Sequence, residues 1–274
     1  MNTQNVSQSQ AKTYGRSAAP LIEELESRGA TIVSVEDLAA IRGVPANSTL
    51  LRSLIKRLKA SGWLRPLARQ GMYEFVPVRV GPYASNDEML ELEALARAAN
   101  APRFQVALGS AAFLRGYADT APATGHLLFD KLATVRPPRL KDRFRVIRTD
   151  PARLFGAEPL SANQHVRVST ASRLFIDAAL YWKHAGDLRA SDHWLASAAR
   201  DVDPTLTSRW ARKLGGSTAA RVGFLADRFG ARSLAEILQS AIKRTTLASF
   251  GPKGRGDYDA RWHVYDAIGI AKSK

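Results

Sequence analysis

The sequence predicts an α+β protein, with an N-terminal winged helix-turn-helix followed by a larger mixed α+β domain. Three observations support this prediction. A capped helix, a glycine–proline break and a second, basic helix follow one another within residues 34–61. Two short strand-like runs, 63–67 and 72–77, then flank a turn, as the strands of a hairpin do. In the remaining chain, short strands come first and most of the periodic helical segments follow, which is typical of an α+β domain.

The first helix of the predicted helix-turn-helix is defined by its two ends. The segment Ser34-Val35-Glu36-Asp37 is a capping box, in which a hydroxyl and a carboxylate bind backbone N–H groups at a helix start. Gly43-Val44-Pro45 ends the helix, because glycine tolerates the strained turn and proline cannot continue a helix. Its apolar face carries Leu38, Ala39 and Ile41. We expect residues 30–33 to form a small strand that pairs with the wing.

The second helix, from Asn47 or Ser48 to about Ser61, has two chemically different faces. At helical spacing one side is apolar and is expected to pack; it consists of Leu50, Leu51, Leu54, Ile55 and Leu58. The opposite side carries cations and hydroxyls: Thr49, Arg52, Ser53, Lys56 and Lys59. Lysine and arginine neutralise phosphates, and arginine, serine and threonine reach base edges in the major groove. A solvated basic face is the alternative, but the capped helix, turn and hairpin around it favour duplex DNA.

The charge balance of the chain favours a polyanionic partner. Of 274 residues, 40 are Lys or Arg and 25 are Asp or Glu, which gives a formal net charge of +15. Such a surplus is typical of proteins that bind DNA or RNA and, less often, an anionic membrane surface. The absence of cysteine excludes disulfides, thiolate metal ligands and a cysteine nucleophile. The polar N-terminus and the lack of a long apolar segment predict a cytoplasmic protein that does not span a membrane.

Composition predicts three parts of the chain. Residues 1–14 are rich in Ser, Gln, Asn and Thr, which is typical of a disordered tail. Residues 15–80 hold the winged helix-turn-helix, including a helix at about 17–28. A Pro- and Gly-containing linker at 78–83 then leads into the C-terminal domain, assigned to 81–274.

The C-terminal domain is predicted from changes in periodicity along its length. Two helices come first, at 86–99 and 105–117, and short strands follow at 126–129, 143–148 and 164–168. Later helical segments are expected at about 170–185, 189–200, 204–214, 217–229 and 234–245, and a last strand at 261–268. The run 135–148 is a secondary basic surface, with Arg136, Arg139, Lys141, Arg143, Arg145 and Arg148.

No pattern in the sequence predicts a catalytic site, a metal site or a cofactor. The five histidines are scattered, and no pair has the helical spacing of a zinc site. His184, Asp187, Asp192 and His193 are close in sequence, but a solvated turn explains them better than a metal site. Gly109-Ser110 resembles the start of a nucleotidyltransferase site, which needs two carboxylates one residue apart. Only a lone Asp119 follows, so this activity is excluded.

Two further features of the C-terminal domain have structural interpretations. Arg173 and Asp177, four residues apart, predict an ion pair at a helix surface. The glycine-rich, basic segment 251–256 does not follow a clear strand or open a helix, so we interpret it as a mobile surface loop.

Several motifs, in a fixed order along both domains, carry a family resemblance. In the first domain they are Arg42-Gly43-Val44-Pro45, Leu58-Lys59-Ala60-Ser61-Gly62-Trp63-Leu64, Arg69-Gln70-Gly71-Met72-Tyr73 and Val76-Pro77. In the second they are Ser169-Thr170-Ala171-Ser172-Arg173 through Asp177, Ala220-Arg221-Val222-Gly223-Phe224-Leu225 and Asp259-Ala260-Arg261-Trp262. Together they resemble AbiEi-type antitoxins, the antitoxin halves of bacterial AbiE abortive-infection, type IV toxin–antitoxin systems. The resemblance spans about residues 17–268, and little aligns between 102 and 159.

The resemblance implies a non-enzymatic repressor that binds inverted repeats upstream of its own operon. It also implies that the C-terminal domain opposes a toxin resembling a nucleotidyltransferase, commonly without a stable complex. No cofactor is implied. A monomer in solution that binds DNA in pairs is compatible with such repeats.

The predicted DNA contacts divide between the second helix and the wing. Thr49, Arg52 and Lys56 would face the major groove, with Ser48, Ser53 and Lys59 beside them. On the wing, Arg65, Arg69 and Gln70 would touch the backbone or the minor groove. Three alternatives stay open: an RNA-binding protein that uses residues 135–148, a general two-domain regulator without a toxin, and a phosphotransferase in the C-terminal domain.

Overall fold

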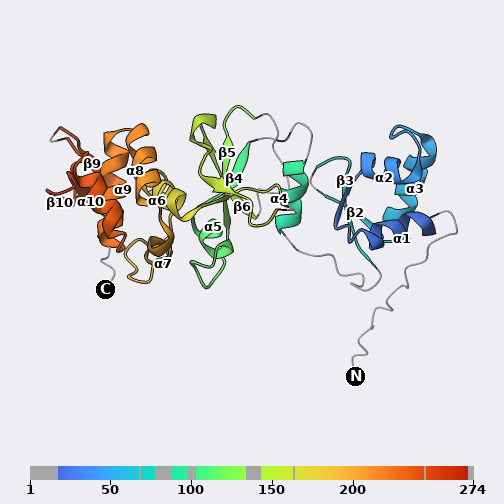
Figure 1. Ribbon diagram of the computed structural model, residues 1–274, viewed down its shortest axis with the longest axis horizontal. Coiled ribbons are helices and arrows are strands. Elements are labelled where there is room, and N and C mark those ends of the chain that lie inside the picture. Colours follow the sequence, from blue (N-terminus) through green and yellow to red (C-terminus); the bar gives the residue numbers. More distant parts are fainter. Residues whose placement is uncertain are drawn as a thin grey trace, which may run out of the picture. The chain divides into compact units, whose positions relative to one another are not determined.

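The computed structural model describes residues 18–67, 69–77, 88–97, 101, 103–133, 143–162, 164–243 and 245–270. The chain divides into two compact units, whose main bodies end at residue 101 and begin at residue 102. Both units are drawn in Figure 1. The predicted disordered tail, 1–14, and the predicted linker, 78–83, lie outside the described residues.

The first unit has the helices and strands of a winged helix-turn-helix. In chain order they are α1 (Ala19–Ser27), β1 (Ile32–Ser34), α2 (Val35–Arg42), α3 (Thr49–Ala60), β2 (Leu64–Pro66) and β3 (Met72–Phe75). The predicted capping box opens α2, since the Asp37 N–H donates to the Ser34 hydroxyl and the Ser34 N–H donates to the Asp37 carboxylate. Gly43 ends α2 in the left-handed conformation, at a φ of +63°, which glycine adopts without strain.

The sheet and core of the first unit hold α3 in place. Strands β1, β3 and β2 pair antiparallel in that order, with Val33 opposite Tyr73 and Leu64 opposite Phe75. The predicted small strand therefore pairs with the wing. Trp63, just after α3, stacks on Phe75 of β3 with 6.0 Å between ring centroids. The buried core below them is formed by Leu21, Ile22, Leu25, Val33, Leu38, Leu51, Leu54, Ile55 and Leu58.

Helix α4 (Glu88–Arg97) also belongs to the first unit. Ala94 packs in a small apolar cluster with Ile32 of β1 and Met72 of β3. The compact unit thus extends past residue 80, where the sequence prediction ended the winged domain, because α4 buries its apolar face against the winged sheet.

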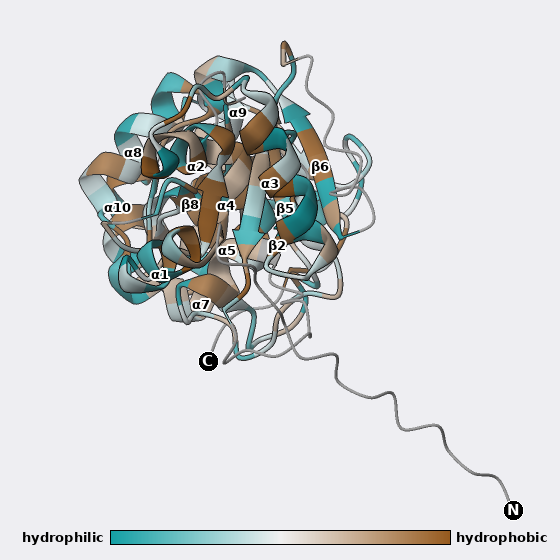
Figure 2. Ribbon diagram, turned by 90° about the vertical axis from the view of Figure 1, so that its right-hand side faces the viewer, coloured by the Kyte–Doolittle hydropathy of each residue, from teal (hydrophilic) through white to brown (hydrophobic). Residues whose placement is uncertain are grey.

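The second unit begins with a mixed sheet. Its strands are β4 (Phe104–Val106), β5 (Gly125–Asp130), β6 (Phe144–Thr149), β7 (Ala157–Glu158) and β8 (Val168–Ser169), in the spatial order β6-β5-β4-β8-β7. The pairs β5–β6 and β4–β8 are parallel, and β4–β5 and β7–β8 are antiparallel. Helix α5 (Leu108–Leu114) lies between β4 and β5 in the chain. Polar and apolar residues follow one another along β6, which can be seen in Figure 2.

The chain between the two sheets of the second unit is mainly helical. Its helices are α6 (Ala171–Leu180), α7 (Trp194–Ala198), α8 (Pro204–Lys213), α9 (Gly216–Arg228) and α10 (Arg232–Gln239). Short 3₁₀ turns join them or precede them: η3 (Pro151–Arg153), η4 (Trp182–His184) and η5 (Ala199–Asp201). Helix α6 packs against α8 and α9, and α9 packs against α10. Each helix overlaps a helical segment predicted from residue 170 onward, but α7 covers only the second half of the predicted 189–200 and α10 ends at Gln239, before the predicted 245.

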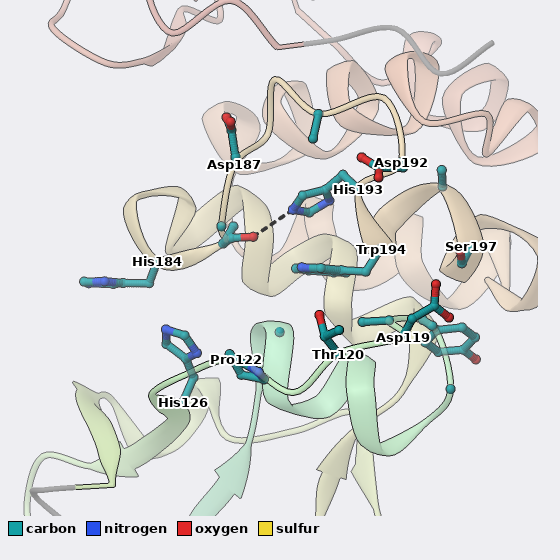
Figure 3. Close-up of a pocket in the computed structure, with 18 of the residues that line it drawn as sticks. Asp119, Thr120, Pro122, His126, His184, Asp187, Asp192, His193, Trp194 and Ser197 are labelled. Carbon is teal, nitrogen blue, oxygen red and sulfur yellow. Dashed lines mark hydrogen bonds between the residues drawn. The ribbon is translucent and has the colours of Figure 1, made fainter.

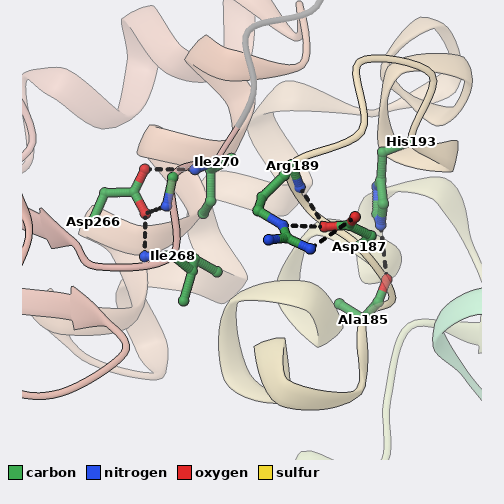
Figure 4. A network of polar contacts seen from close by, with 8 residues as sticks. Ala185, Asp187, Arg189, His193, Asp266, Ile268 and Ile270 are labelled. Carbon is green, nitrogen blue, oxygen red and sulfur yellow. Dashed lines mark hydrogen bonds and ion pairs between the residues drawn. The ribbon is translucent and has the colours of Figure 1, made fainter.

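A small sheet closes the second unit. Strand β11 (Val264–Asp266) pairs antiparallel with β10 (Asp257–Asp259) and parallel with β9 (Ala248–Phe250). The Asp266 carboxylate accepts backbone N–H bonds from Ile268, Gly269 and Ile270, at 3.2, 2.9 and 2.7 Å, and so fixes the chain after β11 (Figure 4). The sequence predicted only the last of these strands.

Several details of the predicted C-terminal domain are wrong. The helix expected from 105 begins at Leu108, because Phe104, Gln105 and Val106 form a strand that is buried along its whole length and so lacks a two-residue alternation. The strand expected at 164–168 is reduced to Val168–Ser169. Strands and helices also do not separate cleanly, since α5 precedes β5 and a second sheet follows the helices.

The ion pair between Arg173 and Asp177 forms, but in the core rather than at a helix surface. Both side chains are fully buried, and Arg173 Nε lies 2.8 Å from Asp177 Oδ1. Ser169 donates a second hydrogen bond to the same carboxylate, at 2.8 Å. The guanidinium also lies over the Phe155 ring, 4.3 Å from its centroid. The i, i+4 spacing is right, but burial depends on how α6 packs.

Among the described helices, none is long and apolar enough to cross a membrane.

Candidate nucleic-acid interface

Helix α3 is the element that presents the candidate interface. Ser48 caps it, because its hydroxyl accepts the Leu51 N–H at 3.2 Å. The helix continues without Gly or Pro to Ala60 and buries Leu51, Leu54 and Leu58 against the core. Its orientation is thereby set by packing on one side, which leaves the other side free for a ligand.

The exposed side of α3 carries the side chains that the sequence assigned to DNA. Thr49, Arg52, Ser53, Lys56 and Lys59 are all exposed. The helix contains no Asp or Glu, so no carboxylate within it neutralises these cations. Arg52 Nη2 donates to the Asn47 carbonyl at 3.1 Å, which directs the guanidinium toward the N-terminal end of the helix. The structure therefore brings together a continuous basic and hydroxyl-bearing face.

The prediction that Leu50 packs in the core is wrong. Its side chain is 74% exposed, whereas Leu54, one turn later on the same side, is buried. Leu50 lies in the first turn of α3, and side chains on a helix tilt toward its N-terminus. Leu51, in the same turn, is buried, so Leu50 is exposed because it lies at the edge of the arc that turns Leu51, Leu54 and Leu58 toward the core.

The turn of the wing holds two of its three predicted residues, of which Gln70 is exposed and Arg69 is half-buried. Arg69 and Gln70 lie in the turn between β2 and β3, where the Met72 N–H donates to the Arg69 carbonyl at 3.1 Å. Gly71 then accepts the Val35 N–H at 2.9 Å, so the wing is fixed to the start of α2. Arg65 differs from these two residues. It forms an ion pair with Glu74, directly opposite on β3, and the pair holds the two wing strands together.

The sequence interpretation missed two cations in this unit. Arg42 ends α2 and Arg57 lies in the last turn of α3, and both side chains are exposed. Arg57 lies seven residues after Leu50, two turns along the same line of the helix. The signal was present in the helical spacing, since residue 57 falls beside Ser53 on the exposed arc.

The secondary basic surface is only partly described by the structure. Arg136, Arg139 and Lys141 lie outside the described residues, whereas Arg143, Arg145 and Arg148 are exposed on or beside β6. Arg148 donates to the Asp130 and Ala133 carbonyls, at 2.8 and 3.1 Å, and lies over the Phe129 ring. Arg148 thus ties β6 to the segment that follows β5, which is a structural role for part of the basic run.

The second unit contains a cavity of about 730 Å³ that the sequence did not predict. Residues from distant parts of the chain line it: Asp119, Thr120, His126, His184, Trp194 and Ser197. Figure 3 shows the two histidines on one side, with Asp119 and Ser197 on the other. No group of three or more His, Asp or Glu in the described part of the chain is arranged to hold a metal ion.

The histidines of this cavity favour their neutral forms. Burial, His184 and Arg145 lower the pKa of His126 from 6.5 to about 4. Burial and Arg145 also lower the pKa of His184, whose Nδ1 lies 3.2 Å from Arg145 Nη1 and therefore accepts. No carboxylate is among the groups that shift the pKa of either ring. The arrangement therefore differs from a histidine general base whose basicity is raised by a neighbouring acid.

His193 has a structural role. Its Nε2 donates to the Ala185 carbonyl at 2.7 Å (Figure 4), and its Nδ1 accepts the Leu195 N–H at 3.2 Å, so both ring nitrogens are used. The ring is buried against Trp194, with 4.5 Å between centroids. The solvated-turn interpretation is therefore wrong for His193. Asp187 is exposed as that interpretation required, and its carboxylate pairs with Arg189 at 2.8 Å.

Two comparisons with known proteins agree with this geometry. Residues 20–76 match the model of a family described as "Transcriptional regulator, AbiEi antitoxin". The matched segment begins in α1 and ends just after β3, so it is the winged helix-turn-helix itself. The resemblance expected from the sequence motifs is confirmed over this segment.

The fold of the whole chain is also found in a solved structure. The crystal structure of the RV2827C protein from Mycobacterium tuberculosis superposes with a TM-score of 0.71 at 22% sequence identity. The superposition covers 96% of each chain, so the similarity includes both units. At this identity it establishes the fold alone. No match was found among curated protein sequences.

Proposed function

Because residues 20–76 match the AbiEi antitoxin family of transcriptional regulators, we propose that this protein is a DNA-binding antitoxin that represses its own operon. The family is one of regulators rather than of enzymes, and we extend this to a non-catalytic, cytoplasmic role for the whole chain. The observation that carries the proposal is the exposed face of α3, which joins cations and hydroxyls on a helix without any carboxylate.

The proposed mode of binding places α3 in the major groove of duplex DNA. Arg52 and Lys56 would neutralise phosphates or reach base edges, and Thr49 would approach the bases near the start of the helix. The turn with Arg69 and Gln70 would contact the flanking backbone or the minor groove. Two copies on an inverted repeat would repeat these contacts at each half-site, even if the free protein is a monomer.

Affinity for the DNA upstream of the protein's own gene tests this proposal. Fluorescence anisotropy across a salt series compares the wild type with Arg52→Ala and Lys56→Ala. A lost base contact lowers the binding free energy by about 1–3 kcal/mol, and a lost phosphate contact reduces the slope of log K against log salt by about 0.9. Lys213→Ala, an exposed cation at the end of α8 in the second unit, is the charge-matched control. Equal affinities for all variants at every salt concentration would show that α3 does not bind the duplex.

The antitoxin part of the proposal concerns a partner. We propose that the protein opposes a toxin resembling a nucleotidyltransferase, encoded beside it, with or without a stable complex. The neighbouring reading frame should then contain a Gly-Ser pair followed by two carboxylates one residue apart, the pattern that holds catalytic metals in such enzymes. Expression of that frame should stop growth, and co-expression of this protein should restore it. Growth arrest that co-expression leaves unchanged contradicts the antitoxin role but not DNA binding.

A further inference from the structure

The first turn of α3 exposes an apolar side chain beside the proposed DNA-binding face. Leu50 is 74% exposed, and the other leucines and the isoleucine of the helix are buried. Its exposed neighbours along the helix are a hydroxyl and a cation, with Ser53 one turn later and Arg57 two turns later. Single exposed leucines are common on protein surfaces, so it is the place of Leu50, in the first turn of the second helix of a helix-turn-helix, that points to a ligand.

The chemistry around Leu50 identifies that ligand. In a helix-turn-helix, the N-terminal residues of the second helix are the ones that reach base edges in the major groove. Leu50 is the second residue of α3 and cannot bind a phosphate or donate a hydrogen bond to a base. The apolar group that the major groove offers is the C5-methyl of thymine. The cations on the same helix attract a polyanion rather than an apolar protein surface.

We propose that Leu50 is a specificity-determining residue that contacts the methyl group of a thymine in the operator. This inference rests on the proposed function, since it requires that α3 lies in the major groove. Burying one methyl group contributes about 0.8 kcal/mol to binding. Since about 1.4 kcal/mol corresponds to a tenfold change in affinity, loss of the methyl contact should weaken binding about fourfold.

Replacing single thymines by deoxyuridine tests the contact, because deoxyuridine lacks only the 5-methyl group. The protected segment of upstream DNA is found by footprinting, and each of its thymines is replaced in turn. At one position the replacement should weaken wild-type binding about fourfold. Leu50→Ala should weaken binding to the unmodified duplex by at least as much, and at that position it should bind the thymine and deoxyuridine duplexes equally. Leu247→Ala, which removes a 51% exposed leucine in the second unit, should keep the wild-type response.

The outcomes separate this inference from the proposed function. If Arg52→Ala and Lys56→Ala weaken binding but no deoxyuridine duplex does, the thymine contact is refuted and duplex binding by α3 stands. If Leu50→Ala weakens binding to the thymine duplex and to the deoxyuridine duplex by the same factor relative to the wild type, the variant still senses the methyl group and the inference fails. The inference also fails if the variant changes the oligomeric state of the free protein, measured as molar mass by light scattering, because Leu50 then has another role. Because Leu50 is exposed, its alanine variant should melt like the wild type, so misfolding does not obscure the result.

Discussion

A single methyl group at Gly223 should destabilise the second unit. Gly223 lies within α9, and its backbone faces the indole of Trp262, which is fully buried between α9 and the closing sheet. An ideal Cβ on Gly223 would lie 1.9 Å from Cζ3, 2.4 Å from Cε3 and 2.6 Å from Cη2 of that ring. Both residues belong to motifs that carry the family resemblance, so the structure shows these two distant motifs in direct contact.

The expected loss of stability in Gly223→Ala is the cost of the steric overlap less the gain in helix propensity. Carbon atoms in van der Waals contact are about 3.5–4.0 Å apart, so the indole would have to move by roughly 1.5 Å in Gly223→Ala. Overpacking of a tight core costs about 1–3 kcal/mol or more, and an overlap of this size belongs at the upper end. Replacing a helical glycine by alanine gains about 1 kcal/mol. The clash exceeds the gain, and we expect a net loss of about 2 kcal/mol or more in the free energy of unfolding.

Urea denaturation followed by tryptophan fluorescence measures this loss. All tryptophans except Trp63 lie in the second unit, so the signal reports mainly on that unit. Gly109→Ala is the matched control, because a Cβ there would meet its nearest neighbours at an ordinary 3.9 Å. It should leave stability unchanged or slightly raised. Trp262→Leu should reduce the cost of Gly223→Ala in a double-mutant cycle. A Gly223→Ala variant as stable as the wild type, or equal costs with and without the indole, would refute the packing argument.

The remaining predictions concern buried ionisable groups. The neutral form of His126 is favoured in the folded state, with a pKa of about 4 against 6.5 unfolded, so the unfolded chain gains a proton first as the pH falls. Stability should therefore fall between pH 6.5 and pH 4, and His126→Gln should flatten the pH dependence of the melting temperature. His184 and His193 shift in the same direction and should retain part of the slope. Asp177→Asn should lower the free energy of unfolding by about 3–5 kcal/mol, because it leaves the buried Arg173 without its counter-charge. A urea midpoint for Asp177→Asn within error of the wild-type midpoint would show that the ion pair does not stabilise α6.

The elements of the first unit could be predicted because their signals are local. The capping box at Ser34, the break at Gly43 and the helix beginning after Ser48 each depend on residues within one or two turns of one another. The basic face of α3 was predicted for the same reason, since helical periodicity assigns its exposed side. The strand β4 was missed because it is buried along its whole length and has no alternation.

The sequence by itself thus determined the winged helix-turn-helix, its basic helix and the charge surplus that favours a nucleic-acid partner. Only the tertiary structure decided which side chains are free to act. Leu50 is exposed because it lies at the edge of the apolar arc of α3, next to the buried Leu51, and Arg65 is engaged because Glu74 lies opposite it across the wing. The contact of Gly223 with Trp262 likewise joins residues far apart in the chain. Periodicity reports the direction of a side chain around its own helix or strand, whereas burial and pairing depend on which distant segments pack against it.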